Sequence, residues 1–428
     1  MKELKNLNEE ERLSITLGCE PFYLRHKEPK ELQGVYQHLC EYIDKKYRPS
    51  IWVFLCATVA PVKYGMTGSI FSLNKNDYST VNNLLGKKGV KVSYVGCKHV
   101  LEILDNLGYI TLYKGFYDEF DKVSVKSCFV INRKLKVLLE NTNIKKVNPI
   151  IPVETLVELR NSNTDELITE LSKLRGINDK RDLVKSYNKL LRTFDLRCKS
   201  YRVSAIYKRV FTDDLSSHGR WYSLGCLQTT KSKYREFITI NGYKTTEIDI
   251  RQMHPRILMT LDGTSLPMSW EPYADITDVV GGEYKIARKL SKFAMMCIIN
   301  AKNECSAKSA IWKAYSDDMK KEEGKRSFKG LTIRKGDLNS IVKKLKEHNS
   351  HISHWFNQER LWAILQHYDS EITAYIIERF VRLGKCILPW HDSYVVSHKD
   401  SKLLIDTMRE AWEHILGTTD NFFYDIEF

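Results

Sequence analysis

The sequence lacks any long hydrophobic run and any closely spaced cysteine pair. Its most apolar stretch, residues 51–62, is shorter than the roughly 18–20 residues of a membrane-spanning helix, and it contains Thr58 and Pro61. The ten cysteines include no C-x-x-C pair, which disfavours a zinc ribbon and a disulfide framework. Acids and amides follow Met1 where a secretion signal would be apolar. These absences predict a cytoplasmic globular protein.

Basic residues exceed acidic ones, 67 to 53, which gives a net charge of +14. A surplus of this size favours a polyanionic partner, because lysine and arginine bind phosphates and release their counterions. A basic soluble protein without such a partner has the same balance, so charge alone leaves both interpretations open. The length of 428 residues suffices for two or three domains.

The N-terminal third has the pattern of a winged helix. Apolar residues at helical spacing predict three helices, and alternating residues then predict two strands joined by a charged loop. Ser93 is of the type that caps a helix, and Gly108 is of the type that ends one. The expected ranges are 51–59, 79–85 and 93–107 for the helices and 109–113 and 123–131 for the strands.

We therefore expect residues 1–146 to form a helical, winged-helix-like domain that binds DNA. A small helical domain that mediates protein contacts is the alternative. The basic side chains that are candidates for phosphate contacts in this domain are Lys98, His99, Lys114 and Lys122.

A second segment, residues 147–205, separates this domain from the C-terminal half. Two prolines within residues 148–152 predict a linker, because proline opposes regular structure. Charged residues and leucines at helical spacing then predict a helical connector or thumb-like segment. The leucines of this expected helical stripe are Leu156, Leu159, Leu167, Leu171 and Leu174.

Two aspartates in the C-terminal half, residues 206–428, are candidate metal ligands. Asp249 lies near the end of a short extended segment, residues 245–250. Asp392 lies between two short apolar segments that predict a hairpin with the acid at its tip. Phosphoryl transfer through paired divalent metals needs two carboxylates close together on rigid elements. Neither acid is informative alone, since a single aspartate at a strand end is usually structural or solvated.

A basic helix face lies between the two aspartates in the sequence. Arg288 and Lys292 are four residues apart, so both point from the same side of a helix. That face is suited to the triphosphate of a nucleotide, while Phe293, Met296 and Ile299 are expected to pack inward. An amphipathic helix with a solvated basic edge is the alternative. The basic segment 320–346 that follows is either an insertion that contacts a template or a solvated loop.

Four short motifs occur here in a fixed order. The first, H-G-R-W-Y followed by L-Q, contains Arg220 and Gln228. The second, D-I-R-Q-M-H-P-R, runs from Asp249 to Arg256, and the third is the R-x-x-x-K of Arg288 and Lys292. The fourth is H-D-S, which contains His391 and Asp392 and is preceded by a helix with Gln366.

In this order the motifs resemble the polymerase domain of family A (DNA polymerase I-type) enzymes and of phage-type single-subunit RNA polymerases. Those enzymes show T-G-R and L-Q-N, then D-Y-S-Q-I-E-x-R, then R-x-x-x-K with a later tyrosine, and H-D-E or H-D-S. The resemblance covers about residues 215–415. It implies an α+β fold with a right-hand (palm, fingers and thumb) polymerase domain, here in a bacterial or phage-infected cell.

The resemblance also implies roles for the motif residues. Asp249 and Asp392 would hold two Mg²⁺ ions, and Arg288 and Lys292 would neutralise charge on the phosphates. The implied partners are a DNA template, nucleoside triphosphates and an RNA or DNA product strand, with an accessory protein left open. The residues implied to contact nucleic-acid strands are Arg220, Gln228, Arg256, Gln366 and His391.

The choice of sugar depends on departures from the family pattern. His254 stands where the DNA enzymes have glutamate, and Asn300 stands where they have tyrosine. The nucleotide-binding set implied by the resemblance is Arg288, Lys292, His254, Asn300 and Ile250. We expect DNA-templated RNA synthesis, in transcription or priming, slightly ahead of DNA synthesis. The alternative from another class is a winged-helix DNA-binding initiator or regulator with an inactive polymerase scaffold.

Overall fold

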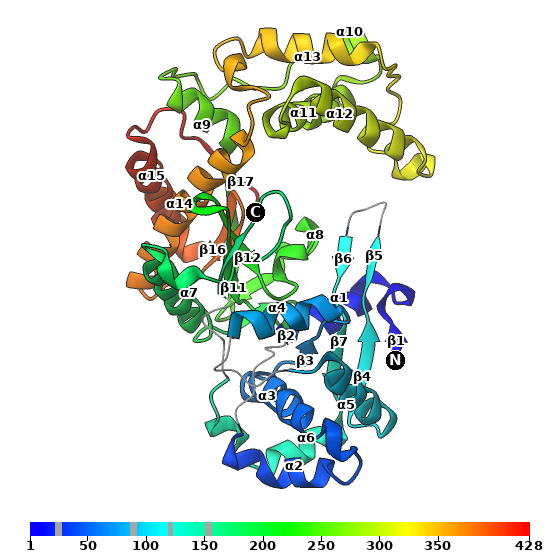
Figure 1. Cartoon of the computed structure of the whole chain (residues 1–428). Coiled ribbons are helices and arrows are strands. Elements are labelled where there is room, and N and C mark those ends of the chain that lie inside the picture. Colours follow the sequence, from blue (N-terminus) through cyan, green and yellow to red (C-terminus); the bar gives the residue numbers. More distant parts are fainter. Residues whose placement is uncertain (22–27, 86–91, 119–122, 150–155) are drawn as a thin grey trace.

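The computed structural model describes residues 1–21, 28–85, 92–118, 123–149 and 156–428. The chain has a mixed α+β architecture. Figure 1 shows an N-terminal unit at the bottom, a central sheet flanked by helices, and an upper group of helices. Two large hydrophobic cores correspond to this arrangement. One involves residues 32–144, and the other is formed mainly by residues 156–422 with Leu17 added to it.

The N-terminal unit contains a five-stranded sheet in the order β1-β4-β7-β3-β2 and a separate β5–β6 hairpin. Strand β7 lies between β4 and β3 and is antiparallel to both. The helices of the unit are α1 (Glu9–Leu17), α2 (Gln33–Leu39), α3 (Pro49–Tyr64), α4 (Lys75–Leu85), α5 (Tyr94–Asn106) and α6 (Arg133–Glu140). The strands are β1 (Lys2–Glu3), β2 (Cys19–Pro21), β3 (Gly68–Ile70), β4 (Ile110–Lys114), β5 (Phe116–Asp118), β6 (Val123–Val125) and β7 (Cys128–Ile131).

The local sequence explains the helices of this unit. Helix α3 is apolar along most of its length and ends at Gly65, whose φ of 67° is left-handed. Helix α5 begins after Ser93, whose side chain accepts a hydrogen bond from the backbone N–H of Gly96. The three expected helices and the strand expected at 109–113 are present, but the strand expected at 123–131 is divided into β6 and β7, which belong to different sheets. Strand β3, which separates α3 from α4, was not predicted.

The central region contains a seven-stranded sheet and a smaller three-stranded sheet, β12-β11-β8. Strand β17 pairs with β14 beside the main path β10-β9-β13-β14-β16-β15. The strands are β8 (Val157–Arg160), β9 (Leu196–Cys198), β10 (Tyr201–Arg202), β11 (Tyr207–Thr212), β12 (Asp214–Ser223), β13 (Ile238–Ile240), β14 (Tyr243–Ile250), β15 (Ile387–Trp390), β16 (Ser393–Ser397) and β17 (Tyr424–Ile426). The helices are α7 (Ile177–Leu191), α8 (Ser232–Arg235), α9 (Met253–Leu261), α14 (Leu361–Arg382) and α15 (Ser401–Leu416).

The upper group consists of α10 (Thr277–Val280), α11 (Tyr284–Asn300), α12 (Glu304–Met319) and α13 (Asp337–His348) (Figure 1). Helix α11 contacts both α12 and α13. The basic segment 320–346 is part of this group, because Phe328, Leu331 and Ile333 are buried in the larger core. It is therefore a packed element and not a solvated loop.

The expected helix after residue 153 is wrong in its first part. Leu156 and Leu159 are buried at β8, which pairs in parallel with β11, and α7 begins only at Ile177. Valine at 157 and burial on both sides favour a strand, which overrides the helical spacing of the leucines. Residues 150–152 of the expected linker lie outside the described residues.

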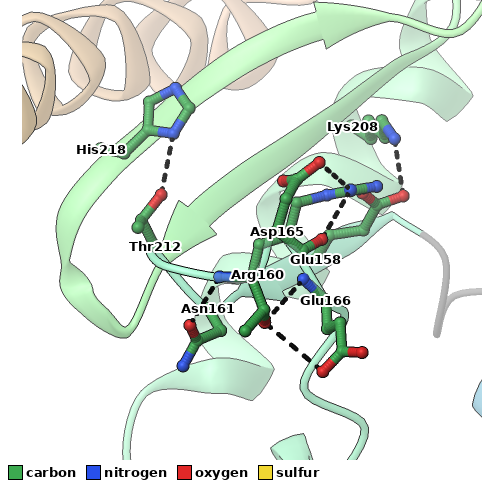
Figure 2. A network of polar contacts seen from close by, with 9 residues as sticks. Glu158, Arg160, Asn161, Asp165, Glu166, Lys208, Thr212 and His218 are labelled. Carbon is green, nitrogen blue, oxygen red and sulfur yellow. Dashed lines mark hydrogen bonds and ion pairs between the residues drawn. The ribbon is translucent and has the colours of Figure 1, made fainter.

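A polar network holds the three-stranded sheet together (Figure 2). Arg160 donates to Glu158 and Asp165, and Lys208 forms an ion pair with Glu158 at 2.6 Å. Across the β11–β12 hairpin, His218 Nδ1 lies 3.2 Å from the Thr212 hydroxyl. These contacts fix the hairpin whose second strand carries Arg220 toward the helix α14. Within the described residues, no helix has the length and apolar character to cross a membrane.

Candidate two-carboxylate site

The fold brings Asp249 and Asp392 to the same place. Asp249 is near the end of β14, and Asp392 is in the turn between β15 and β16. The backbone N–H of Ile250 donates to the carbonyl of Asp392 at 3.0 Å, and Asp249 faces Ser393 in the antiparallel register. His391 adopts a left-handed φ of 66° within the turn. Three chain segments, β14 and the two strands of the hairpin, thus fix the backbones of both acids.

The two acids repel each other. Burial and then the charge of Asp392 raise the pKa of Asp249 to about 8, and Glu427, Asp425 and Glu247 add smaller effects. Burial and the charge of Asp369 raise the pKa of Asp392. In the part of the chain that the structure describes, no basic side chain forms an ion pair with either acid. The pair therefore has the electrostatic character of a site that a divalent cation would stabilise.

The donor set fits Mg²⁺ with exogenous ligands. Across the described residues, no group of three or more His, Cys, Asp or Glu side chains is arranged to hold a metal ion. Magnesium is commonly bound by one or two carboxylates, with the remaining positions taken by water and substrate phosphates. Asp249 and Asp392 supply such a partial set and leave positions for a triphosphate.

Two basic side chains of α11, Arg288 and Lys292, lie close to the Tyr273 ring. Arg288 donates to Glu271 through Nε at 2.8 Å, and its guanidinium lies 5.1 Å from the centre of the Tyr273 ring. The Lys292 ammonium is 5.9 Å from the same ring. Burial raises the pKa of Tyr273 to about 12, and the charges of Asp392 and Asp249 act in the same direction. Tyr273 is thus within electrostatic reach of the basic helix and of both carboxylates.

The outward side of α11 differs from expectation at one position. Ile299 is buried and Phe293 is half-buried, but Met296 is 53% exposed, so its predicted inward packing is wrong. Residues 288, 292, 296 and 300 follow one another at intervals of four and lie along one side of the helix. Arg288, Lys292, Met296 and Asn300 therefore form a continuous outward stripe.

A buried acid beside Asp392 was missed by the sequence reasoning. Asp369, on α14, is 1% exposed and accepts a hydrogen bond from Arg220 Nε at 2.8 Å. His254 Nε2 lies 3.2 Å from Arg220 Nη2 and 3.8 Å from the Asp369 carboxylate. Burial would raise the pKa of Asp369, but Arg220 and His254 lower it below the ordinary value. Gln366, from the same helix, is half-buried.

Sequence spacing gives no signal for Tyr273 or Glu271, which lie in a loop before α10. For Asp369 the only signal was its position three residues after Gln366. These residues are recognised by their contacts and not by a motif. The remaining motif residue, His391, has its pKa lowered by burial and by the charge of Arg220.

Three of the residues implied to contact nucleic acid or nucleotide have side chains that are buried or hydrogen-bonded within the protein. Arg256 is fully buried, and its guanidinium donates to the carbonyls of residues 267, 268 and 270. The Gln228 side-chain amide donates to the carbonyls of residues 221 and 389, while its oxygen accepts from the N–H of Ser223. The Ile250 side chain is fully buried in the larger core. The Arg256 and Ile250 side chains are therefore inaccessible to nucleic acid or nucleotide, and the half-buried Gln228 side chain is engaged in hydrogen bonds within the protein.

The two lysines expected to contact DNA lie in the N-terminal unit. Lys98, on α5, is 44% exposed and forms an ion pair with Glu102 at 3.8 Å. Lys114, at the end of β4, is 56% exposed and lies 3.8 Å from Glu3. Lys122 lies outside the described residues. Both described lysines are accessible, and their ion pairs are loose enough to be exchanged.

Comparison with known proteins gives a limited result. No protein-family model matches the chain, and no curated protein matches its sequence. Among solved structures, the chain is similar to the polymerase domain of Pol1 from M. smegmatis, in complex with a DNA primer-template and dNTP. The identity is 11%, the match covers 92% of this chain and 65% of that chain, and the TM-score is 0.30. The chain thus spans less than two thirds of that domain. At this TM-score the similarity carries no weight for function, which rests on the site itself.

Proposed function

We propose that this protein is a template-directed nucleic-acid polymerase that performs nucleotidyl transfer at Asp249 and Asp392. One observation carries the proposal. Two acids that are 392 − 249 = 143 residues apart are held on paired strands, half-buried and without an ion-pair partner among the described residues. Such a pair is unfavourable in a purely structural setting and favourable where divalent cations and a triphosphate enter.

The residues around the pair suit the reaction. Two Mg²⁺ ions, when bound, supply activation of the attacking hydroxyl and neutralisation of the phosphates. Asp249 and Asp392 would hold these ions, and Arg288 and Lys292 would bind the phosphate oxygens of the nucleotide. In the reaction the 3′-hydroxyl oxygen would bond to the α-phosphorus, its proton would pass to solvent water, and the bond between the α-phosphorus and the pyrophosphate leaving group would break. Glu271 holds the Arg288 guanidinium in place on α11.

We also propose that ribonucleotides are used in preference to deoxyribonucleotides. The position implied to lie beside the sugar holds His254, whose ring is tied to Arg220 and Asp369, where the DNA enzymes have a glutamate. Asn300, at the exposed end of α11, offers an amide that can bond a hydroxyl. DNA synthesis is the alternative.

The test is incorporation of labelled nucleotides by the purified protein with Mg²⁺. Primed and unprimed DNA templates are each combined with the four rNTPs or the four dNTPs, and Asp392→Asn serves as the inactive control. We expect template-dependent products that are faster with rNTPs and absent for the variant. Tight duplex binding without incorporation of any substrate would instead support an initiator or regulator with an inactive scaffold.

A DNA-binding role is proposed for the N-terminal unit. It is supported by the order α3, β3, α4, α5, β4 and β7, with β7 between β3 and β4, because this order is similar to that of a winged helix; the sheet additionally contains β1 and β2. Lys98→Ala with Lys114→Ala should weaken duplex binding about equally for all sequences and reduce its salt dependence. Lys136→Ala, on α6, is the matched control, and an equal loss for the control would contradict the role.

A further inference from the structure

Acidic residues of α1 cover a basic surface of the central region. Glu9 lies 2.8 Å from Lys231 and 2.7 Å from Lys233, and Glu10 lies 2.6 Å from Lys199. Lys231 precedes α8, Lys233 is within it, and Lys199 lies between β9 and β10. The three lysines come from two separate segments, so the fold gathers them. We call Lys199, Lys231 and Lys233 the basic ridge.

The basic ridge adjoins the strands of the candidate site. Arg235, the last residue of α8, forms an ion pair with Glu247 at 2.6 Å, and Glu247 is two residues before Asp249 on β14. The Arg235 guanidinium also lies 5.5 Å from the centre of the Trp390 ring, at the end of β15. A nucleic-acid strand that approached the two aspartates from the side of the basic ridge would therefore pass over α8.

The surface around the ridge combines positive charge with exposed aromatic rings. Lys199 lies 5.4 Å from the ring centre of Tyr234 and 5.5 Å from that of Phe237, which is 45% exposed. Lys233 lies 4.8 Å from the ring of Tyr234. Basic side chains interleaved with aromatic rings are typical of surfaces that bind a nucleic-acid backbone and its bases.

Helix α1 and the β5–β6 hairpin enclose this surface from the other side. A cavity of about 190 Å³ lies between α1, both strands of the hairpin and the segment before α8. Its lining includes Glu9, Lys231 and Phe116, and Arg12 stacks on the Phe116 ring at 5.0 Å. Figure 1 shows α8 on the side of the central sheet that faces this hairpin. The N-terminal unit thus places Glu9 and Glu10 over the surface beside the candidate site.

We propose that the basic ridge binds the phosphate backbone of a nucleic-acid duplex, and that Glu9 and Glu10 occupy it as competing anions in the free protein. The inference rests on the nucleic-acid partner of the proposed function. The carboxylates of Glu9 and Glu10 take the positions that phosphate oxygens take in the complex. Exchange is feasible because Lys231 and Lys233 are 58% and 57% exposed, so their ion pairs hold them only weakly. Phosphate binding gains from counterion release, which the internal carboxylates do not provide.

Duplex binding in the absence of nucleotide and Mg²⁺ tests this inference. The full chain with Glu9→Gln and Glu10→Gln should bind a primer-template duplex about tenfold more tightly than wild type at low salt, with a steeper salt dependence. Asn8 and Glu11, which form the capping box of α1, are unchanged in this variant. Glu140→Gln, which removes a similarly exposed ion pair on α6, is the control and should leave the Kd unchanged. Adding Lys199→Ala, Lys231→Ala and Lys233→Ala to the tight-binding variant should abolish its gain, because these three lysines are the partners of Glu9 and Glu10.

Two results would overturn the inference. Unchanged or weaker duplex binding by the Glu9→Gln, Glu10→Gln variant would show that the acids only connect the two parts of the protein. A gain that survives loss of all three ridge lysines would show that it reflects net charge and not the ridge. Circular dichroism confirms that each variant is folded. Because no catalysis is measured, a protein that binds as expected but incorporates no nucleotide would refute the proposed function and leave this inference standing.

Discussion

The core of the N-terminal unit and the surroundings of Asp249 differ in what they bury. The N-terminal core is built from side chains such as Ile51, Phe54, Leu104 and Phe129, and the cluster they belong to is apolar. The one acid of that unit that is fully buried among its described residues, Glu20, faces the central region and forms an ion pair with Arg192.

The central region buries charged groups close to the site. Arg209 and Arg256 are fully buried, and Glu247 and Asp369 are each 1% exposed. Arg209 pairs with Glu371, Glu247 pairs with Arg235, and Asp369 pairs with Arg220. Buried ion pairs contribute little to stability, and apolar residues would serve a core at least as well. The N-terminal interior serves packing, whereas the buried charges of the central region lie around the proposed site.

Loss of either carboxylate should have the largest effect on catalysis. Asp249→Asn and Asp392→Asn should each lower the rate of incorporation by at least about 10³-fold, because each removes a metal ligand. The double variant should be scarcely slower than either single variant, since the two acids act as a unit. Single-turnover incorporation measures the rates. Additive losses in the double variant would show that the acids act separately.

A core substitution in the N-terminal unit should lower stability and leave the rate of incorporation nearly unchanged. Leu104 on α5 is fully buried, so Leu104→Ala should lower the free energy of unfolding by about 2–5 kcal/mol. Its incorporation rate per folded molecule should remain close to that of wild type. Chemical denaturation and active-site titration measure the two quantities. A lower incorporation rate per folded molecule of the Leu104→Ala variant would mean that packing in the N-terminal unit affects the site in the central region.

The basic side chains of α11 should contribute less to catalysis than the two aspartates do. Arg288→Ala should lower kcat/KM for the nucleotide by about 10²-fold, because a preorganised positive charge is removed from the phosphates. Lys289→Ala is the matched control, since Lys289 is exposed on the same helix but lies off the outward stripe. Steady-state kinetics over a range of nucleotide concentrations gives both values. Equal effects of the two changes would remove the assigned role of Arg288.

The smallest effect concerns pH and stability without metal. The folded-state pKa of Asp249, about 8, is raised above the ordinary value of 3.8, so the protonated acid favours the folded state. The stability that this group contributes is fully present below about pH 4 and is lost as the pH rises through about 8. Asp249→Asn should therefore raise the Tm at about pH 9 in EDTA by roughly 2–4 °C.

At about pH 4 the same variant should have a much smaller effect on the Tm, because Asp249 is then protonated in the folded state and only about half ionised in the unfolded state. Thermal unfolding at the two pH values makes the comparison. A Tm that falls at high pH in the variant would contradict the repulsion between Asp249 and Asp392. Added Mg²⁺ should raise the Tm of wild type at high pH, since it binds the folded state.

Much of the N-terminal unit follows from the sequence. The apolar run before Gly65 and the cap at Ser93 predicted α3 and α5, because both signals are local. Strand β3 has only three residues and includes a glycine and a serine, so no periodicity marks it. Its pairing with β7 and β2 is made by tertiary contacts, which local propensity does not show.

The candidate site was predicted in part. The structure contains the expected strand that ends near Asp249 and the expected hairpin with Asp392 at its tip. The pairing of β14 with β16 brings the two aspartates together. The partners Asp369, Glu271 and Tyr273 could not be predicted, because they come from α14 and from a loop with no recognisable spacing. Arg256 matched a motif but turned inward, since residue identity does not reveal which side of a helix faces the core.

The most direct test of the central claim is the binding of Mn²⁺, as a paramagnetic substitute for Mg²⁺, measured by electron paramagnetic resonance. The protein is held with a primer-template and an incoming nucleotide whose transfer is blocked by a chain-terminated primer. We predict that the wild-type protein binds Mn²⁺ and that this binding is lost in both Asp249→Asn and Asp392→Asn. Binding in both variants with the affinity of wild type would contradict the assignment of these two aspartates as the metal-holding pair.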